Sequence, residues 1–240
     1  MPRKENIRRM FDSISGDYDK LNHIMSASVD KSWRRRALKY VVSPGSTQGG
    51  LAVLDVACGT GDFSLAIARK MEKAGVSGLV TGVDLSEGML NVMRSKVEEA
   101  GLGERISALK GDGEELGFAD GSFDRVTIAF GIRNFENRQK GLEEFFRVLK
   151  PGGRLVILEL SLPGNPVLRW LYNLYFLKIL PSVGALISGE RAAYEYLPAS
   201  VLKFPRPGEF LKSVEKAGFS KVFSKSYTLG ICRLFVGEKA

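Results

Sequence analysis

The sequence predicts an α/β fold in which helices flank a seven-stranded, mostly parallel sheet. Apolar, strand-like runs alternate with helical patterns between residues 51 and 160, which is typical of parallel sheets with right-handed crossovers. The first of these runs, residues 51–56, leads directly into a glycine turn and a helix. Two further runs, 219–227 and 229–237, are close enough in sequence to form a hairpin that closes the sheet.

The core elements follow from the spacing of apolar and turn residues. We expect strands at 51–56, 79–83, 105–110, 124–130 and 154–160. We expect helices between them at 62–74, 86–100 and 137–149. The stretch from Leu149 to Gly153 contains a proline and two glycines, and it is interpreted as the turn that ends the third helix and starts the fifth strand.

The amino-terminal part is expected to be helical. Residues 5–25 have the pattern of a helix followed by a loop, with Gly16 as the break. Residues 29–41 place Trp33 and other apolar side chains on one helical face. The Gly- and Ser-rich residues 43–50 then form a linker into the core.

An insertion, residues 163–207, separates the fifth strand from the last helix. Within it, residues 166–181 are apolar almost all round if they are helical. This segment is either buried by the amino-terminal helices or lines a groove for a long apolar ligand, and both alternatives stay open. We therefore divide the chain into an amino-terminal helical cap, 1–42, and a core, 51–240, that includes the insertion.

The glycine turn predicts a nucleotide-type cofactor. Gly59 and Gly61 lack a Cβ, so the backbone can turn sharply and a ligand can lie against it. The helix that follows presents free N–H groups, which suit a carboxylate or a phosphate. Ser64 replaces the third glycine of the dinucleotide fingerprint. Asp55 stands inside the strand before the turn, and Asp84 ends the next strand, where a carboxylate can accept hydrogen bonds from ribose hydroxyls.

An ordered set of four residues resembles the signature of class I methyltransferases that use S-adenosylmethionine: Asp55, Gly59, Gly61 and Asp84. This resemblance implies a Rossmann-like fold with an antiparallel closing strand. Asp112 and Gly113 follow the third strand in the same frame as Asp84. There, the Asp112 carboxylate can accept a hydrogen bond from an adenine amine, and the Gly113 N–H can donate one to a ring nitrogen.

Charge is concentrated at the amino terminus. The 240 residues carry a net charge of +8. Residues 1–40 hold ten Lys or Arg and five Asp or Glu, a net of +5 (10 − 5), which leaves +3 for the rest of the chain. Such a segment is attracted to a polyanionic surface, either nucleic acid or anionic lipid, or it is a solvated helical face.

The remaining composition favours a reducing cytosol and a single core. The two cysteines, Cys58 and Cys232, lack metal-ligand spacing, so no metal site is expected. Cys58 is interpreted as a packing residue in the glycine turn. We expect no signal peptide and no membrane span, since no run reaches about 20 uncharged apolar residues.

Longer motifs resemble the ubiquinone/menaquinone biosynthesis C-methyltransferase family over nearly the whole chain. They are Phe11-Asp-Ser-Ile-Ser-Gly-Asp-Tyr-Asp-Lys-Leu-Asn22, Ser32-Trp33, Leu54-Asp-Val-Ala-Cys-Gly-Thr-Gly-Asp62, Phe130-Gly-Ile-Arg-Asn134 and Arg147-Val-Leu-Lys-Pro-Gly-Gly-Arg-Leu155. The resemblance implies a prenylated quinol as substrate and a cytoplasmic enzyme that works, in peripheral contact, at the inner face of the membrane. A homodimer stays open as an assembly, and no nucleic-acid partner is expected.

The resemblance also assigns cofactor-binding positions beyond the glycines and Asp55. They are Thr60, Asp84, Leu85, Asp112 and Gly113. Some family members carry serine at the position of Ala129, two residues before Gly131. Alanine has no hydroxyl, so a cofactor contact at this position can come only from the backbone.

The implied chemistry is C-methylation. The methyl donor is already electrophilic, whereas the ring carbon becomes nucleophilic only when a neighbouring hydroxyl loses its proton. Arg133 is our candidate for stabilising the phenolate, with Asn134 and Tyr18 positioning the ring. His23, the only histidine, is a candidate base, although a lone histidine in a polar loop is as often a cap or a surface residue.

Three other functions are weighed against methylation of demethylmenaquinol. The first is C-methylation of a polyprenyl benzoquinol in ubiquinone biosynthesis. The second is methylation of RNA, which would use the basic amino terminus. The third is a non-catalytic quinone-binding scaffold, against which Asp84 and Asp112 argue because such a scaffold needs no intact cofactor edge.

Overall fold

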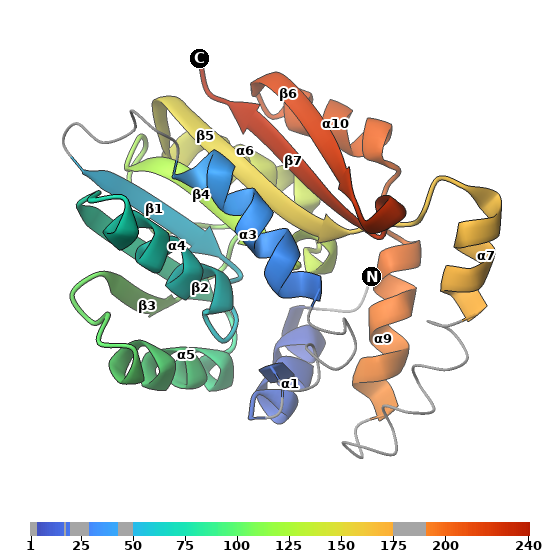
Figure 1. The fold of residues 1–240 in the computed structure, drawn as a ribbon, viewed down its shortest axis with the longest axis horizontal. Coiled ribbons are helices and arrows are strands. Elements are labelled where there is room, and N and C mark those ends of the chain that lie inside the picture. Colours follow the sequence, from blue (N-terminus) through green and yellow to red (C-terminus); the bar gives the residue numbers. More distant parts are fainter. Residues whose placement is uncertain (1–3, 17, 20–28, 43–49, 175–190) are drawn as a thin grey trace.

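A computed structural model describes residues 4–16, 18–19, 29–42, 50–174 and 191–240 (Figure 1). Seven strands form one sheet in the order β3-β2-β1-β4-β5-β7-β6. They are β1 Leu51–Val56, β2 Gly78–Asp84, β3 Ile106–Lys110, β4 Phe123–Ala129, β5 Leu149–Leu160, β6 Ser220–Tyr227 and β7 Cys232–Glu238. The pairs from β3 through β5 are parallel, and β7 is antiparallel to both of its neighbours. The predicted fold class is confirmed.

Helices cover both faces of the sheet because strand side chains alternate between the two faces. Val53 of β1 packs with α3 (Val29–Val41), α4 (Asp62–Lys73) and α5 (Glu87–Glu99). Leu54, the next residue, packs on the opposite face with α6 (Arg138–Val148) and α10 (Pro207–Lys216). Both side chains are fully buried. The core therefore consists of two apolar layers separated by the sheet.

The amino-terminal segment contributes two described helices. α1 spans Lys4–Ile14 and is followed by a turn at Ser15 and Gly16, as the sequence predicts. α3 buries Trp33, and the indole N–H of Trp33 donates to the Thr228 hydroxyl at 2.8 Å. α3 is thus anchored to η3 (Thr228–Gly230), the turn between β6 and β7. In Figure 1, α3 crosses the front of the sheet.

The insertion contributes α7 (Pro166–Leu174) and α9 (Arg191–Leu202), at the end of the molecule where β5 finishes (Figure 1). Helix is confirmed for the first half of the expected apolar segment 166–181. The rest of that segment falls within residues 175–190, which lie outside the described residues. None of the helices that the structure describes is both long enough and apolar enough to cross a bilayer.

One expected boundary is wrong. The fifth strand begins at Leu149 and not at residue 154, because the stretch expected to be a turn is a bulge within β5. Gly152 has a φ of +74°, and its N–H donates to the Lys239 carbonyl at 2.8 Å. The bulge is therefore held by the last residues of the chain, which local sequence reasoning does not include.

Candidate active site

The glycine turn after β1 approaches the turn after β4 at the carboxyl edge of the sheet. A Cβ placed on Gly131 would lie 2.6 Å from the Cβ of Ala57, so only glycine allows this approach. Gly61 has a φ of +83°, the left-handed conformation that glycine adopts without strain. α4 then begins at Asp62. Two turns that are about 70 residues apart in sequence thus lie side by side at this edge, as ligand sites do in open parallel sheets.

Asp84 links the glycine turn to the end of β2. Its Oδ2 accepts from the Gly59 N–H and its Oδ1 from the Ser86 N–H, both at 2.9 Å. Burial raises the pKa of Asp84, although these backbone hydrogen bonds oppose the effect. Asp112, at the end of β3, accepts from the Glu114 N–H at 2.9 Å. Both carboxylates therefore occupy the ends of neighbouring parallel strands, as predicted.

These carboxylates line a cavity of about 80 Å³. Four of the predicted cofactor residues and one of the predicted catalytic residues form part of its wall: Asp84, Leu85, Asp112, Gly113 and Asn134. Lys4, Ile7, Arg8 and Phe11 of α1 form its roof. α1 therefore covers the strand ends at which the two carboxylates lie.

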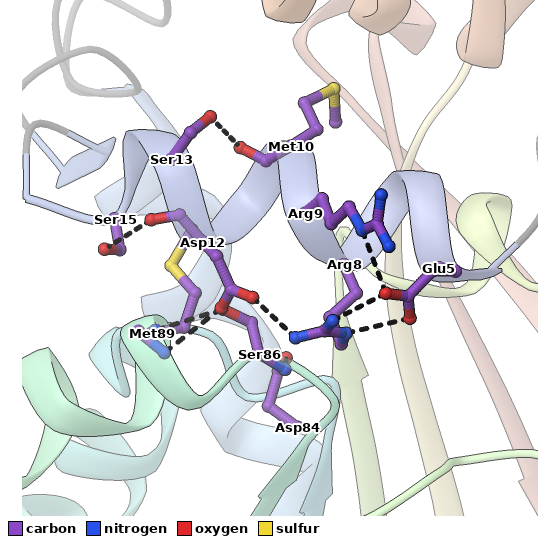
Figure 2. A network of polar contacts seen from close by, with 11 residues as sticks. Glu5, Arg8, Arg9, Met10, Asp12, Ser13, Ser15, Asp84, Ser86 and Met89 are labelled. Carbon is purple, nitrogen blue, oxygen red and sulfur yellow. Dashed lines mark hydrogen bonds and ion pairs between the residues drawn. The ribbon is translucent and has the colours of Figure 1, made fainter.

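Polar contacts fix α1 in place, and Figure 2 shows those of Arg8 and Asp12. Asp12 accepts a hydrogen bond from the Ser86 hydroxyl and another, at 3.2 Å, from the Gly88 N–H at the start of α5. Arg8 donates to the second Asp12 oxygen at 2.9 Å. At the other end of α1, the Lys4 ammonium lies 2.7 Å from Asp112 and 3.1 Å from Glu114. Sequence reasoning did not find Lys4 or Asp12, although Asp12 belongs to the first family motif.

The remaining predicted cofactor residues do not line the cavity. Asp55 is buried beneath the glycine turn, where it accepts from the Ser64 hydroxyl at 2.5 Å and the Thr127 hydroxyl at 2.8 Å. Burial raises its pKa to about 6. The Thr60 hydroxyl donates to Asp19, and Ala129 ends β4, paired with Leu158 of β5.

The turn after β4, η1 (Ile132–Asn134), carries two of the predicted catalytic residues. Arg133 is buried and donates from Nη1 to Glu159 at 2.8 Å. Burial by itself would lower the pKa of Arg133, but the Glu159 carboxylate and the nearby Tyr18 and Tyr196 outweigh it, so the pKa is raised. Arg133 is thus a fixed cation beside three groups that the sequence places far apart.

Three of the four predicted catalytic residues therefore converge. Tyr18 lies close enough to influence Arg133 and also contacts Phe11 edge-on, with ring centroids 5.9 Å apart. Asn134 follows Arg133 directly and accepts from the Tyr196 hydroxyl at 2.9 Å. His23 lies outside the described residues. Glu159 and Tyr196 were not predicted, because neither belongs to a motif that sequence reasoning singled out.

Comparisons with known proteins give matches over nearly the whole chain. Residues 2–239 match the model of a family described as the ubiE/COQ5 methyltransferase family. A Bacteroides fragilis protein named demethylmenaquinone methyltransferase is 43% identical over 238 residues, covering 99% of this chain and 94% of that protein. A Geobacter sulfurreducens protein named ubiquinone/menaquinone biosynthesis C-methyltransferase UbiE is 46% identical over 235 residues, with coverages of 98% and 89%.

A solved structure shares the fold. An S-adenosylmethionine-dependent methyltransferase from Thermotoga maritima superposes with a TM-score of 0.66, covering 97% of this chain and 99% of that one. The two sequences are 18% identical, so this likeness concerns the fold alone.

Proposed function

Because this chain belongs to the ubiE/COQ5 methyltransferase family, we propose that it transfers the methyl group of S-adenosylmethionine to a ring carbon of demethylmenaquinol, giving menaquinol. The observation that carries this proposal is that residues predicted to bind the cofactor and a residue predicted to be catalytic line the same cavity. Asn134 lines the same cavity as Asp84 and Asp112, and the buried Arg133 precedes it in the same turn. C-methylation of a benzoquinol is the second candidate, because the name of the Geobacter relative covers both quinones.

The residues present fit the cofactor. Two carboxylates at adjacent strand ends, Asp84 and Asp112, can accept from ribose hydroxyls and from an adenine amine. The Gly113 N–H can donate to the adenine ring, and the first turn of α4 presents N–H groups that suit a carboxylate. When bound, S-adenosylmethionine supplies an electrophilic methyl group. Asp55 supports the turn from below through Ser64 and Thr127.

The substrate side must hold a quinol oxygen as it loses its proton. Negative charge then develops on that oxygen, and a buried, preorganised cation stabilises it more than water does. Arg133 is such a cation, and its Nη2 makes no hydrogen bond within the described residues. Asn134 and Tyr18 orient the ring. His23 stays our candidate for the base.

We further propose that α7 brings the enzyme to its lipid-soluble substrate. Val167, Trp170 and Leu174 are 66%, 64% and 37% exposed, and they follow one face of the helix. Leu229, on the turn that accepts a hydrogen bond from the Ser161 hydroxyl just before α7, is 71% exposed. An apolar stripe with an exposed tryptophan suits the boundary between lipid headgroups and acyl chains. The net charge of +8 favours an anionic surface.

The direct test is methyl transfer from labelled cofactor to demethylmenaquinol, run under dithionite and again under air. Only the reduced quinol has a hydroxyl whose deprotonation activates the ring carbon, so we expect product under dithionite and little under air. Equal rates on both forms would contradict phenolate activation. Faster transfer to a demethylated benzoquinol would favour the second candidate, and transfer to RNA instead of quinol would contradict the proposed function.

A further inference from the structure

Two side chains of α9 hold two consecutive residues of the η1 turn. The Tyr196 hydroxyl donates to Asn134 Oδ1 at 2.9 Å, and Arg133 Nε donates to the Ser200 hydroxyl at 3.2 Å. Tyr196 and Ser200 are four residues apart, so they lie on the same face of the helix. One helix of the insertion therefore contacts both substrate-side residues of the proposed site through separate hydrogen bonds.

Arg133 also makes hydrogen bonds to β5 and to the residue that follows β4. Glu159 Oε1 accepts from Arg133 Nη1 at 2.8 Å, and Glu159 Oε2 accepts from the backbone N–H of Arg133 at 3.1 Å. The Phe130 carbonyl accepts a further bond from Nη1. The side chains of Arg133 and Glu159 are 5% and 0% exposed, so water does not compete for these contacts. Because Nε and Nη1 are occupied, the guanidinium has a fixed orientation in which Nη2 is the remaining donor.

The α9 contacts also determine which atoms of Arg133 and Asn134 can donate a hydrogen bond to a ligand. The Ser200 hydroxyl donates to the Leu197 carbonyl at 2.7 Å, which leaves its oxygen lone pairs for Arg133 Nε. With Oδ1 of Asn134 bound to Tyr196, the amide nitrogen is the side of Asn134 that can donate to a ligand. Arg133 and Asn134 thus each present a donor, as a developing phenolate requires.

We propose that Tyr196 and Ser200 are positioning residues, which align Asn134 and Arg133 for the quinol oxygen. This inference rests on the proposed methyl transfer. Since small misplacements of a reacting group slow catalysis strongly, loss of either hydroxyl is expected to lower kcat more than it raises KM for the quinol. Cofactor affinity should change little, because neither residue lines the cavity and Asn134 is not among the residues proposed to bind the cofactor.

The test compares Tyr196→Phe with Tyr40→Phe, which removes a phenol hydroxyl from α3, where the Tyr40 ring packs against Phe223 of β6. We expect kcat to fall about 10- to 100-fold in Tyr196→Phe and to be unchanged in Tyr40→Phe. If Tyr196 acts through Asn134, the double variant Tyr196→Phe/Asn134→Ala should be no slower than Asn134→Ala alone. Independent, multiplying losses would overturn the positioning role, as would wild-type kcat in Tyr196→Phe.

Ser200 provides a second measurement that does not depend on the first variant folding. Ser200→Ala removes the acceptor for Arg133 Nε and should lower kcat, whereas Ser200→Thr keeps the hydroxyl and should restore part of it. Equal kcat values for wild type, Ser200→Ala and Ser200→Thr would overturn the inference for Ser200. Wild-type enzyme without methyl transfer to any quinol would instead contradict the proposed function, so the two failures are distinguishable.

Discussion

Asp84 joins the cofactor cavity to the glycine turn, so its removal should affect both. Asp84→Ala deletes an acceptor for ribose and also releases the Gly59 N–H. We expect S-adenosylmethionine binding to weaken by about 1.5–3 kcal/mol, the scale of a lost hydrogen bond to a charged group. Calorimetric titration measures this. The control is Asp120→Ala, because the Asp120 side chain is 80% exposed and pairs with Arg147. This variant should bind S-adenosylmethionine with wild-type affinity. Unchanged affinity in Asp84→Ala would remove Asp84 from the site.

Asp55 gives a prediction about stability and pH. Burial raises its pKa from 3.8 to about 6, so the folded protein binds this proton more tightly than the unfolded chain does. Its contribution to the free energy of unfolding is therefore fully present below pH 3.8 and is lost as the pH rises through 6. The difference is about 3 kcal/mol.

Urea unfolding of wild type and Asp55→Asn across this pH range isolates that contribution. Other titrating groups act in both proteins and cancel in the difference. Relative to the variant, the wild type should become less stable by about 3 kcal/mol between acid and neutral pH. Parallel curves would show that Asp55 does not titrate as its burial indicates.

At the scale of single residues, the sequence predicts site residues best where a polar or glycine residue directly follows the end of a strand. Asp84, Asp112 and Gly113 follow strand ends and were found for that reason. Glu159 was not found, because it pairs with Arg133 across 26 positions and by itself looks like a strand residue. Tyr196 was not found either, because its partner is 62 positions away. Such pairs depend on how elements pack, which local spacing does not determine.

At the scale of elements, the sheet was predictable and the position of α1 was not. The strand pattern and the glycine turn specify β1, α4 and β2 almost to the residue. The docking of α1 depends on polar contacts from Lys4 and Asp12 to residues more than 70 positions away. The division into a cap, 1–42, and a core, 51–240, stays a prediction.

Lys4 allows the effect of α1 on cofactor binding to be measured. Its ammonium contacts Asp112, the residue proposed to bind adenine, and so stabilises α1 over the cavity. Lys4→Met should raise both the association and the dissociation rate of S-adenosylmethionine, because α1 is then held less tightly over the cavity. A partly exposed ion pair contributes up to about 1 kcal/mol, so we expect a change of about fivefold in each rate.

Stopped-flow binding measures both rates. Arg9→Met is the matched control, since Arg9 is on the same helix, is 72% exposed and pairs only with Glu5 within the described residues. Its rates should equal those of the wild type. If Lys4→Met leaves dissociation unchanged, α1 does not control exchange of the cofactor.

At the scale of the whole molecule, charge and apolar exposure act together. A net charge of +8 favours the proposed contact with an anionic surface but does not specify an orientation. In the proposed membrane contact, the exposed face of α7 would specify the orientation, because Val167 and Trp170 are exposed on it. α9, the other described helix of the insertion, reaches the η1 turn. The insertion thus contains both the proposed membrane contact and the proposed head-group contact.

The two tryptophans allow that orientation to be tested in solution. Trp33 is 5% exposed and bound to Thr228, whereas Trp170 is 64% exposed. If α7 enters the headgroup region, anionic vesicles should shift the emission of Trp170 to shorter wavelengths while Trp33 stays unchanged. The shift should weaken in high salt and with neutral vesicles, because charge brings the protein to the surface. Trp170→Phe should still sediment with anionic vesicles, since it keeps the charge and most of the apolar face, but without the spectral change. A shift that persists in Trp170→Phe, or vesicle binding without any shift in the wild type, would place the membrane contact elsewhere on the molecule.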